Sequence, residues 1–521
     1  MRYPVEQFSE QERALLAPHF TNLDRPVFAL VNLPETVKGA LFARYSRYGG
    51  TLRRLFLDEF ARDLPARGAP FDGAEGERAA DLYSKIFLGY GDDSVAQLGG
   101  AHIACEWVSN VATKVLQRGR LGAYLEQSTR YLPYDLPMPD GRYRYWRDPS
   151  LGPEYESAMD GLFATYADGL AAVGRWAERA FPRAEGEPEG ARARSLRAKA
   201  LDLMRGLLPA ASLSHMGIFA SGQAYEQLVM RLLGSPLPEA RDLGSMLLGE
   251  LKQVVPSFVT RVERPDRGGA WIDYNAERRG AADRAARRLG LRDPGDEGPS
   301  VRLLDVSGSE HDALAALLFE SSTVSEANTL IAVEALSGAE REALLIELVG
   351  ERRNRRHRPG RGLERVRYRF EVVSDYGAFR DLQRHRMLTV QWQPLTPDLG
   401  AGVPDELRAA GVADAFVQAL DRSGAEYERL VDSGRPELAP YALCLAFRIR
   451  YVLDLNAREA MHLIELRSAR EGHPGYRAVA HEMHALIAGV HPGIAAAMSH
   501  VDRDTEPRLE RILAEIRTPT P

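Results

Sequence analysis

The chain has 521 residues, of which 45% are hydrophobic, and a formal net charge of -6 at pH 7. A chain of this length can bury a large core and is expected to form more than one domain. The negative charge excludes wholesale affinity for nucleic acid, although basic residues are concentrated locally. No long apolar run and no charged-then-apolar leader is present, so neither a membrane span nor a secretory signal is predicted, and cytoplasmic residence is expected.

Cysteine is almost absent. Cys105 and Cys444 each lie inside an apolar stretch. This pattern excludes a disulfide scaffold and a cysteine-rich zinc site, and it gives no support to a thiol nucleophile.

The first half of the chain contains a segment typical of a strand followed by a helix, and then LQRGRLGAYLEQSTRY at residues 116–131. Apolar residues at helical spacing predict helices over residues 195–209 and 224–234. Most of these apolar positions are expected to form core.

A change in composition separates the two halves. Proline, glycine and charged residues cluster at 264–270 and 292–300, which is typical of a linker, and VRLLDVSG at 301–308 then predicts a new opening strand. We therefore expect a first domain over residues 1–275, a linker over 276–300 and a second domain over 301–521.

The second half carries a dense basic run, RRNRRHRPGRGLERVRYR, at residues 352–369. Within it, residues 365–373 alternate polar and apolar side chains, which predicts a strand whose arginines share one face. Such a face suits phosphate groups or a dinucleotide; the alternative is a surface strand paired with neighbouring carboxylates. An RNA-binding module would also use this run, but it lacks interleaved aromatic residues beyond Tyr368 for base stacking.

The predicted strand leads into a helix and then into a segment of unusual composition. SDYGAFRDLQRHR, residues 374–386, predicts a short helix with Ser374 or Asp375 as its N-cap and with Arg384, His385 and Arg386 at its end. The stretch RHRMLTVQWQPLTP, residues 384–397, suits neither a helix nor a central strand. Two arginines flanking a histidine are typical of an anion site, although they would also complement a helix C-terminus.

Further helices are predicted at residues 412–434 and 457–469. On the second of these, Arg458 and His462 occupy positions i and i+4 of one face, directly after Asn456. This arrangement can present several hydrogen-bond donors to one ligand.

The two halves contain a repeated motif. Residues 116–131 and 382–397 both begin Leu-Gln-Arg-x-Arg, and both follow a predicted strand and helix. Because the surrounding organisation matches as well, gene duplication explains the repeat better than chance does.

These residues resemble the signature of flavin-dependent thymidylate synthases, Arg-His-Arg-x-x-Ser-x-Asn-Glu-x-Ser-x-Arg-Tyr, divided between the two halves. The second half keeps Arg384, His385 and Arg386 and then departs, with Thr389, Gln391, Trp392, Pro394, Thr396 and Pro397 at the remaining signature positions. The first half has Gly119 for the histidine and Leu125 for the asparagine, but it keeps Glu126, Ser128, Arg130 and Tyr131.

The resemblance continues around the signature. DLNAREAMHLIELR, residues 454–467, is similar to the family's Asn-Ala-Arg helix, whereas residues 220–233 of the first half have lost that asparagine and arginine. Residues 89–102 and 356–365 lie where the family has a Gly-His-rich loop. The resemblance implies an α+β fold of two tandem domains, each a small, mostly antiparallel sheet packed with helices.

The resemblance also implies partners and an assembly. The family's enzymes are homotetramers whose active sites lie between subunits and bind FAD and dUMP, with methylenetetrahydrofolate and NADPH as co-substrates. Two tandem halves can replace two subunits, so we expect a homodimer of tandem chains that forms a pseudo-tetramer with composite sites. Reduced flavin supplies the hydride in this family, and the absence of a cysteine nucleophile agrees with that.

Residue roles follow from the same resemblance. The residues expected to bind FAD are Arg384, His385, Arg386, Asn456, Arg458 and His462. The guanidinium groups of Arg384 and Arg386 match a pyrophosphate. For dUMP binding they are Ser128 and Arg130 at the phosphate, Glu126 and Tyr131 ordering the loop, and Arg450. Arg467 is expected to contact the uracil and to act catalytically by stabilising negative charge on it.

Each assignment has an alternative. Arg118 and Arg120 could cap a helix, and Arg130 could pair with a carboxylate such as Asp135. His473, His481 and His484 lack the spacing of a zinc protease, so no metal is expected. Alternative functions are a diverged flavin- or nucleotide-binding protein without synthase activity, which Pro394 and Pro397 favour, and an enzyme acting on another pyrimidine nucleotide.

Overall fold

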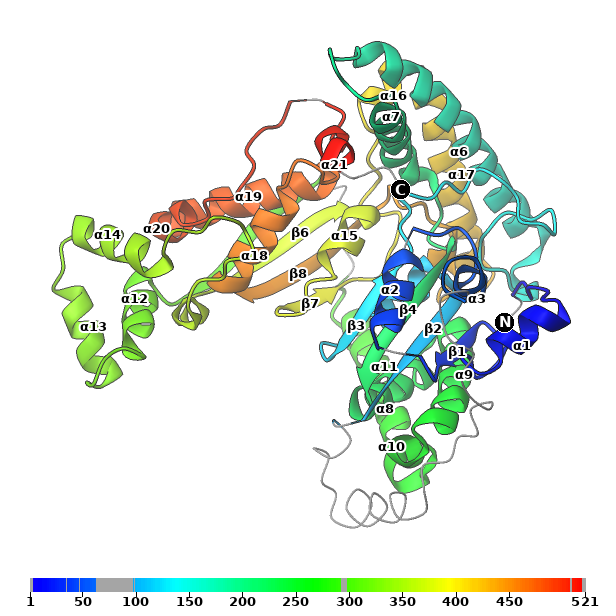
Figure 1. Ribbon diagram of the computed structural model, residues 1–521, viewed down its shortest axis with the longest axis horizontal. Helices are drawn as coiled ribbons and strands as arrows, with labels where there is room; N and C mark the ends of the chain where they lie inside the picture. The colour runs from blue at the N-terminus through cyan, green and yellow to red at the C-terminus, as the bar shows by residue number, and fades with distance from the viewer. Residues whose placement is uncertain are drawn as a thin grey trace. The chain divides into compact units, whose positions relative to one another are not determined.

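The computed structural model describes residues 3–33, 35–45, 47–61, 97, 99–291, 298–506 and 508–517 (Figure 1). It divides into two compact units. Unit 1 comprises Met1–Ala167, Leu208–Asp293 and Asp421–Leu443, and unit 2 comprises Asp168–Leu207, Pro294–Leu420 and Cys444–Pro521. Each unit therefore uses chain segments from both halves of the sequence.

Unit 1 is built on a four-stranded antiparallel sheet in the order β1-β2-β4-β3. The strands are β1 (Val27–Leu30), β2 (Gly100–Ser109), β3 (Gly122–Glu126) and β4 (Leu213–Ser221). Successive side chains of β1 point to opposite faces, and both faces are buried: Val27 and Ala29 join one hydrophobic cluster, Phe28 and Leu30 the other.

Helices cover both faces of this sheet. On one side lie α5 (Asn110–Leu116), α8 (Gly222–Leu233) and α9 (Pro238–Val254); on the other lie α1 (Glu10–Leu16), α2 (Glu35–Tyr45) and α3 (Leu52–Leu55). The serine that ends β2 and the serine that ends β4 cap the helices that follow, since Ser109 accepts from the backbone of Ala112 and Ser221 from that of Ala224. The sheet thereby fixes where α5 and α8 begin.

Unit 2 repeats this plan. Its antiparallel sheet has the order β5-β6-β8-β7, with β5 (Ser300–Ser307), β6 (Arg367–Asp375), β7 (Thr389–Trp392) and β8 (Arg448–Asn456). Helix α15 (Tyr376–Leu382) follows β6, α18 (Ala457–Arg467) follows β8, and α19 (Pro474–Val490) packs on β5 and β6. The two sheets have equivalent strand orders, so the predicted α+β fold with two tandem antiparallel-sheet domains is confirmed.

The remaining helices complete the units. They are α6 (Gly152–Ala180), α7 (Glu189–Met204), α10 (Pro256–Val259), α11 (Ala270–Arg288), α12 (Glu310–Phe319), α13 (Glu326–Glu334), α14 (Gly338–Val349), α16 (Glu406–Ala409), α17 (Ala413–Asp432), α20 (Pro492–Ala496) and α21 (Ile512–Arg517). The described helices are either too short or too polar to cross a bilayer.

The predicted linker, residues 276–300, has two parts in the structure. Residues 276–288 are helical, because they continue α11, and residues 292–297 lie outside the described residues. The domain limits 1–275 and 301–521 stay a prediction about the duplicated sequence, since the compact units are built from interleaved segments.

Several predicted elements occur with shifted ends. The strand predicted at 301–308 is β5, and the helices predicted at 195–209, 224–234, 412–434 and 457–469 are α7, α8, α17 and α18. The helix predicted over 374–386 has Asp375 as its N-cap but ends at Leu382. Arg384, His385 and Arg386 therefore lie in the turn between α15 and β7, an edge strand that tolerates the prolines after it.

Candidate active site

His385 is the buried residue of the Arg-His-Arg motif. It follows α15, and only 6% of its surface is exposed, whereas Arg384 and Arg386 on either side are exposed. Its Nδ1 lies 2.9 Å from Oε1 of Glu459, a residue of the first turn of α18. The motif and the Asn-Ala-Arg helix thus meet inside unit 2.

Glu459 binds two histidines with its two oxygens. Oε2 lies 3.3 Å from Nδ1 of His462, and the rings of His385 and His462 have their centroids 5.3 Å apart. Burial by itself raises the pKa of Glu459, but the hydrogen bonds from His385 and His462 outweigh burial and lower it to about 2. Glu459 is therefore a carboxylate at neutral pH.

Arg467 contacts His385 from the opposite side. Its Nε donates to Nε2 of His385 at 3.0 Å, and its guanidinium carbon lies 5.4 Å from the ring centroid of Tyr476. Burial lowers the pKa of His385 to about 4, against the raising effect of its hydrogen bond to Glu459. Burial also lowers the pKa of Arg467, although Asp381 and Tyr476 oppose that shift. A neutral imidazole thus lies between a carboxylate and a guanidinium.

The exposed rim of this cluster is basic. Arg384 lies 3.9 Å from Asp381, and Met387 beside it is 70% exposed. Arg450, the other residue predicted to bind dUMP in this half, lies on β8 opposite Val373 of β6. An anionic ligand approaching the motif would meet Arg384 and Arg386 before it reached the buried His385.

Two predicted flavin ligands already have protein partners. Asn456 is the N-cap of α18, where its Oδ1 accepts from the backbone of Glu459 at 2.9 Å. Arg458 donates to the carbonyl of Pro359 at 2.9 Å and to Glu364 at 3.4 Å. The structure therefore places His462, but not Arg458, beside His385.

His385, Glu459 and His462 are also the three described residues whose ligand atoms could converge on a metal ion, within 4.8 Å of one another. Arg467 opposes such an ion, because its N–H occupies Nε2 of His385 and its positive charge repels a cation. The expectation of no metal stays a prediction. His481 and His484 each contact a backbone carbonyl instead.

The dUMP-binding residues predicted from the first half lie in unit 1. Glu126 ends β3 and is buried, with Lys114 at 3.1 Å and Gln117 at 2.9 Å. After it, the Ser128 hydroxyl accepts from the backbone of Arg130 at 3.2 Å. Tyr131 is 41% exposed and lies under the guanidinium of Arg47. Glu126 thus anchors the start of the loop, in which Ser128 and Arg130 are half-buried and Tyr131 is exposed.

The segment of unit 1 that corresponds to the Arg-His-Arg motif has different residues at the key positions. Gly119 stands where His385 stands, and a Cβ added to it would lie 2.8 Å from the hydroxyl of Tyr124. Counting from the helix caps Ser221 and Asn456, Leu232 occupies the position of Arg467 and is a fully buried core residue. His215 replaces Arg450 and stacks on Tyr45 at 5.5 Å.

The basic run of the second half is mostly neutralised. Arg367 and Arg369 of β6 share a face, as predicted, but both contact Asp454 of β8, at 2.8 and 3.5 Å. Arg352 is buried against Glu465 at 2.5 Å. The alternative of a surface strand paired with carboxylates is therefore correct for Arg367 and Arg369, because the adjacent strand supplies Asp454.

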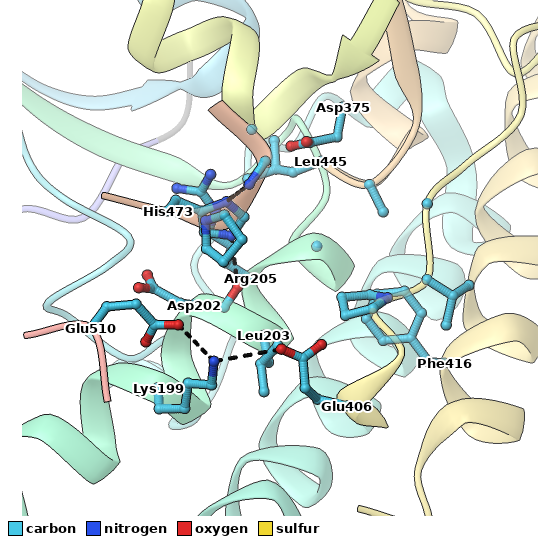
Figure 2. A pocket seen from close by; sticks show the side chains of 18 residues that line it. Lys199, Asp202, Leu203, Arg205, Asp375, Glu406, Phe416, Leu445, His473 and Glu510 are labelled. Carbon is cyan, nitrogen blue, oxygen red and sulfur yellow. Dashed lines mark hydrogen bonds and ion pairs between the residues drawn. The ribbon is translucent and has the colours of Figure 1, made fainter. Parts of the chain in front are cut away.

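A cavity of about 280 Å³ lies inside unit 2 (Figure 2). Lys199 contacts Glu510 at 2.7 Å and Glu406 at 3.5 Å on its wall. Arg205 also lines it; this residue is buried and contacts Asp381 at 3.4 Å, while its Nη2 finds no hydrogen-bond partner in the part of the chain that the structure describes. Asp381 also contacts Arg384, so Asp381 links Arg205 to the Arg-His-Arg motif.

Sequence reasoning missed Glu459, Asp381 and Arg205. Glu459 had a signal, because an acidic residue three positions before His462 on a helix lies on the same face. Asp381 had a similar signal, because it lies three positions before Arg384. Arg205 had none, since it lies far from both motifs in the sequence.

Comparison with known proteins gives a family match in both halves. The sequence model of the family described as thymidylate synthase complementing protein matches residues 58–257 and 302–493. The chain is 38% identical over 526 residues to a UPF0159 protein of Chlamydia muridarum, covering 98% of each. It is 38% identical to a UPF0159 protein of Chlamydia pneumoniae, covering 91% of each, and 31% identical to one of Thermoplasma acidophilum, covering 92% of this chain and 98% of that one.

Solved structures give a weaker likeness. Crystal structures of the UMP/dUMP methylase PolB from Streptomyces cacaoi, bound with 5-Br dUMP or 5-Br UMP, are 24% and 20% identical and cover 40% and 39% of this chain. They cover 98% and 94% of the PolB chains, with TM-scores of 0.32 and 0.31. Scores this low do not extend the substrates of PolB to this chain.

Proposed function

Because the chain belongs to the thymidylate synthase complementing protein family, we propose that it is a flavin-dependent thymidylate synthase. The reaction would convert dUMP to dTMP, with methylenetetrahydrofolate as carbon donor, FAD as the redox cofactor and NADPH as the reductant. The methylene group of methylenetetrahydrofolate would pass to C5 of the uracil, C5 would lose its hydrogen as a proton, and a hydride supplied by reduced FAD would complete the methyl group and leave tetrahydrofolate. The proposed location is the cytoplasm.

One observation carries this proposal: the contact between His385 and Arg467 at 3.0 Å. These residues come from the two separate motifs of the second half, and unit 2 brings them together with Arg384 and Arg386 at the exposed rim. Both guanidinium groups are exposed to solvent, so they remain accessible to an anionic ligand even though Arg384 also contacts Asp381.

The donor set fits a flavin dinucleotide. Arg384 and Arg386 are exposed guanidinium groups that suit its pyrophosphate, and His462 is half-exposed beside them. Asn456 and Arg458 would act on the flavin site by holding α18 and the 359–364 loop in place. When bound, FAD would supply the hydride and accept electrons from NADPH.

Arg467 has the properties required of an electrostatic catalyst. It is held between His385 and Tyr476 in a desolvated position, where a fixed positive charge acts strongly on nearby charge. A guanidinium so placed can stabilise negative charge developing on the uracil without rearranging. Arg450 would contact the same nucleotide from β8.

The dUMP phosphate would bind to Ser128 and Arg130 of unit 1. The buried Lys114–Glu126 pair supports this, since it fixes the strand end from which that loop begins. Tyr131 and Arg47 would order its exposed part. The composite site would form in a homodimer of tandem chains, and the replacement of the motif residues by Gly119 and Leu232 predicts one flavin for each chain rather than two.

The test is flavin and nucleotide binding in matched variants. Arg384→Ala should abolish the visible flavin spectrum, with Arg302→Ala, an exposed residue of β5, as its control. Arg130→Ala should keep flavin and weaken dUMP binding, with the exposed Arg142→Ala as its control. Normal affinities in both Arg384→Ala and Arg130→Ala would refute these roles.

The same preparations decide the substrate. Purified protein should bind about one FAD for each chain, and adding dUMP should perturb that spectrum and give dTMP with methylenetetrahydrofolate. Turnover of UMP in place of dUMP would indicate another pyrimidine nucleotide as substrate. Absence of flavin after incubation with FAD would reject the synthase.

A further inference from the structure

Three charged or polar groups form a continuous line of hydrogen bonds in unit 2. Glu459 Oε1 lies 2.9 Å from His385 Nδ1, and His385 Nε2 lies 3.0 Å from Arg467 Nε. We propose that Glu459 is a positioning residue, which fixes His385 in its Nδ1-protonated form so that Nε2 accepts from Arg467 and holds that guanidinium in place. This inference rests on the proposed function for the role of Arg467, but the line of hydrogen bonds can be tested without it.

The direction of each hydrogen bond follows from the chemistry of its ends. Arginine has only N–H donors, so Nε2 of His385 must be the acceptor and carry no proton. The single proton of a neutral imidazole is then on Nδ1, where it points at the carboxylate of Glu459. A doubly protonated His385 would place two N–H groups against each other at 3.0 Å.

Glu459 is well held for this role. It lies in the first turn of α18, where the positive end of the helix dipole stabilises a carboxylate. Its second oxygen contacts His462 at 3.3 Å, so the carboxylate is fixed at both ends. Loss of both side-chain oxygens would remove the acceptor that selects Nδ1–H over Nε2–H in His385.

The duplicated half shows that this carboxylate is not needed to begin the helix. In unit 1 the equivalent position, three residues after the cap, is Ala224, and its backbone N–H still binds the capping Ser221. Ala224 occurs where Gly119 replaces the histidine and Leu232 the arginine. The carboxylate is therefore present in the unit that keeps both of its partners and absent from the unit that lost them.

The first experiment reads the tautomer of His385 directly. Full-length protein labelled with ¹⁵N-histidine would be examined by solid-state NMR, and His385→Asn would identify the His385 signals among those of the 12 histidines. Wild type should show Nδ1–H and an unprotonated Nε2. Glu459→Gln, which keeps an oxygen acceptor, should retain this form, whereas Glu459→Ala should lose it. Glu465→Gln, on the same helix and paired with Arg352, is the structural control and should not change it.

The second experiment measures kinetics on the same variants. Glu459→Ala should lower kcat by roughly 10- to 100-fold, with the KM for dUMP changed far less, because an electrostatic catalyst would be misplaced. Glu459→Gln should keep most of the wild-type kcat. The pH dependence of its kcat should resemble that of wild type more than that of Glu459→Ala does. A drop in KM and kcat together that matches Glu465→Gln would identify a merely structural residue and overturn the proposal.

The two proposals fail differently. If the protein binds no flavin and turns over no nucleotide, the synthase is wrong, and the NMR signals still decide the role of Glu459. His385 protonated on Nε2 or on both nitrogens in wild type would overturn the positioning role, as would an unchanged tautomer in Glu459→Ala. A shift of the Nδ1 signal on adding ZnCl₂ would assign Glu459 to a metal site instead. If Glu459→Ala does not fold, the wild-type tautomer and Glu459→Gln remain decisive.

Discussion

The hydroxyl of Tyr124 lies 2.8 Å from the point where a Cβ on Gly119 would sit. Gly119 is the first-half equivalent of His385, so Tyr124 occupies the space that the histidine side chain would need. A histidine at this position of unit 1 would therefore meet the hydroxyl end of the Tyr124 side chain.

The contact between Tyr124 and Gly119 gives a testable coupling. Gly119→Ala should lower the free energy of unfolding by up to about 1 kcal/mol, because the added methyl group displaces the hydroxyl end of the half-buried Tyr124 side chain. Tyr124→Phe removes the clashing oxygen, so Gly119→Ala in that background should cost less. Urea unfolding of the four proteins measures the coupling as a double-mutant cycle. Gly174→Ala, a helical position with open space around it, is the control and should not destabilise. Equal costs of Gly119→Ala in both backgrounds would contradict the steric explanation.

Arg467→Lys tests whether the guanidinium geometry matters beyond its charge. Lysine keeps the positive charge but cannot reproduce the fixed N–H that points at His385, so kcat should fall by roughly 100-fold while flavin stays bound. Arg470→Lys is the matched control: Arg470 follows Arg467 by three residues but contacts Asp502 and Asp504. Steady-state rates with dUMP measure the difference, and similar rates for the two variants would remove Arg467 from the catalytic role.

Much of this architecture follows from local sequence patterns. The alternation in residues 365–373 and the Asp375 cap predict β6 and α15, and the repeated Leu-Gln-Arg-x-Arg predicts two equivalent units. The family resemblance and the tandem organisation are confirmed by the match in both halves. These features are readable because periodicity, caps and motifs are encoded by neighbouring residues.

Long-range pairing could not be read in the same way. Arg367 looks like a phosphate ligand until its strand partner supplies Asp454, 87 residues later. Glu459 looks like a surface helix residue until His385 packs against it from 74 positions away. The helical continuation of α11 past residue 275 was missed because flanking glycines and prolines dominate the composition there. These features depend on contacts between distant residues or on the final length of a helix, and both are determined only in the folded protein.

Glu239 of unit 1 should make stability depend on pH in a defined direction. It is fully buried, with Ser109 donating through its backbone N–H at 2.8 Å and its hydroxyl at 2.6 Å, and with Tyr441 donating at 2.7 Å. Burial raises the pKa of Glu239 from 4.5 to about 7, although these hydrogen bonds oppose the shift. Between pH 4.5 and pH 7 the folded state binds more protons at Glu239 than the unfolded state does. The free energy of unfolding therefore falls as the pH rises, by at most about 1.4 kcal/mol per pH unit from this group.

Glu239→Gln should remove that dependence, because an amide does not titrate. Relative to wild type, the variant should gain on the order of 3 kcal/mol in free energy of unfolding between pH 4.5 and pH 8. Urea unfolding at several pH values, with the exposed Glu428→Gln as control, measures the gain. A difference between variant and wild type that does not change with pH would show that Glu239 is already ionised in the folded protein.

Two fragments cut after residue 291 should fold only together. Residues 168–207 lie on the first fragment but belong to unit 2, where Lys199 contacts Glu510 at 2.7 Å and Arg205 contacts Asp381 at 3.4 Å. Separating the fragments would break both pairs, and the buried Lys199 and Glu510 would each lose this partner, a loss of about 3–5 kcal/mol for a broken buried pair. Fragments 1–291 and 292–521 should therefore copurify when coexpressed with a tag on one of them and should be largely insoluble when expressed singly.

Substitutions on α7 sharpen this test. Lys199→Ala in the first fragment should reduce copurification, because Glu510 would be left buried and unpaired, whereas the exposed Arg197→Ala on the same helix should have no effect. The recovered complex should also bind flavin if unit 2 has been completed. Fragments that each unfold cooperatively as soluble monomers would contradict the interleaved units, since sequential halves would then be sufficient for folding.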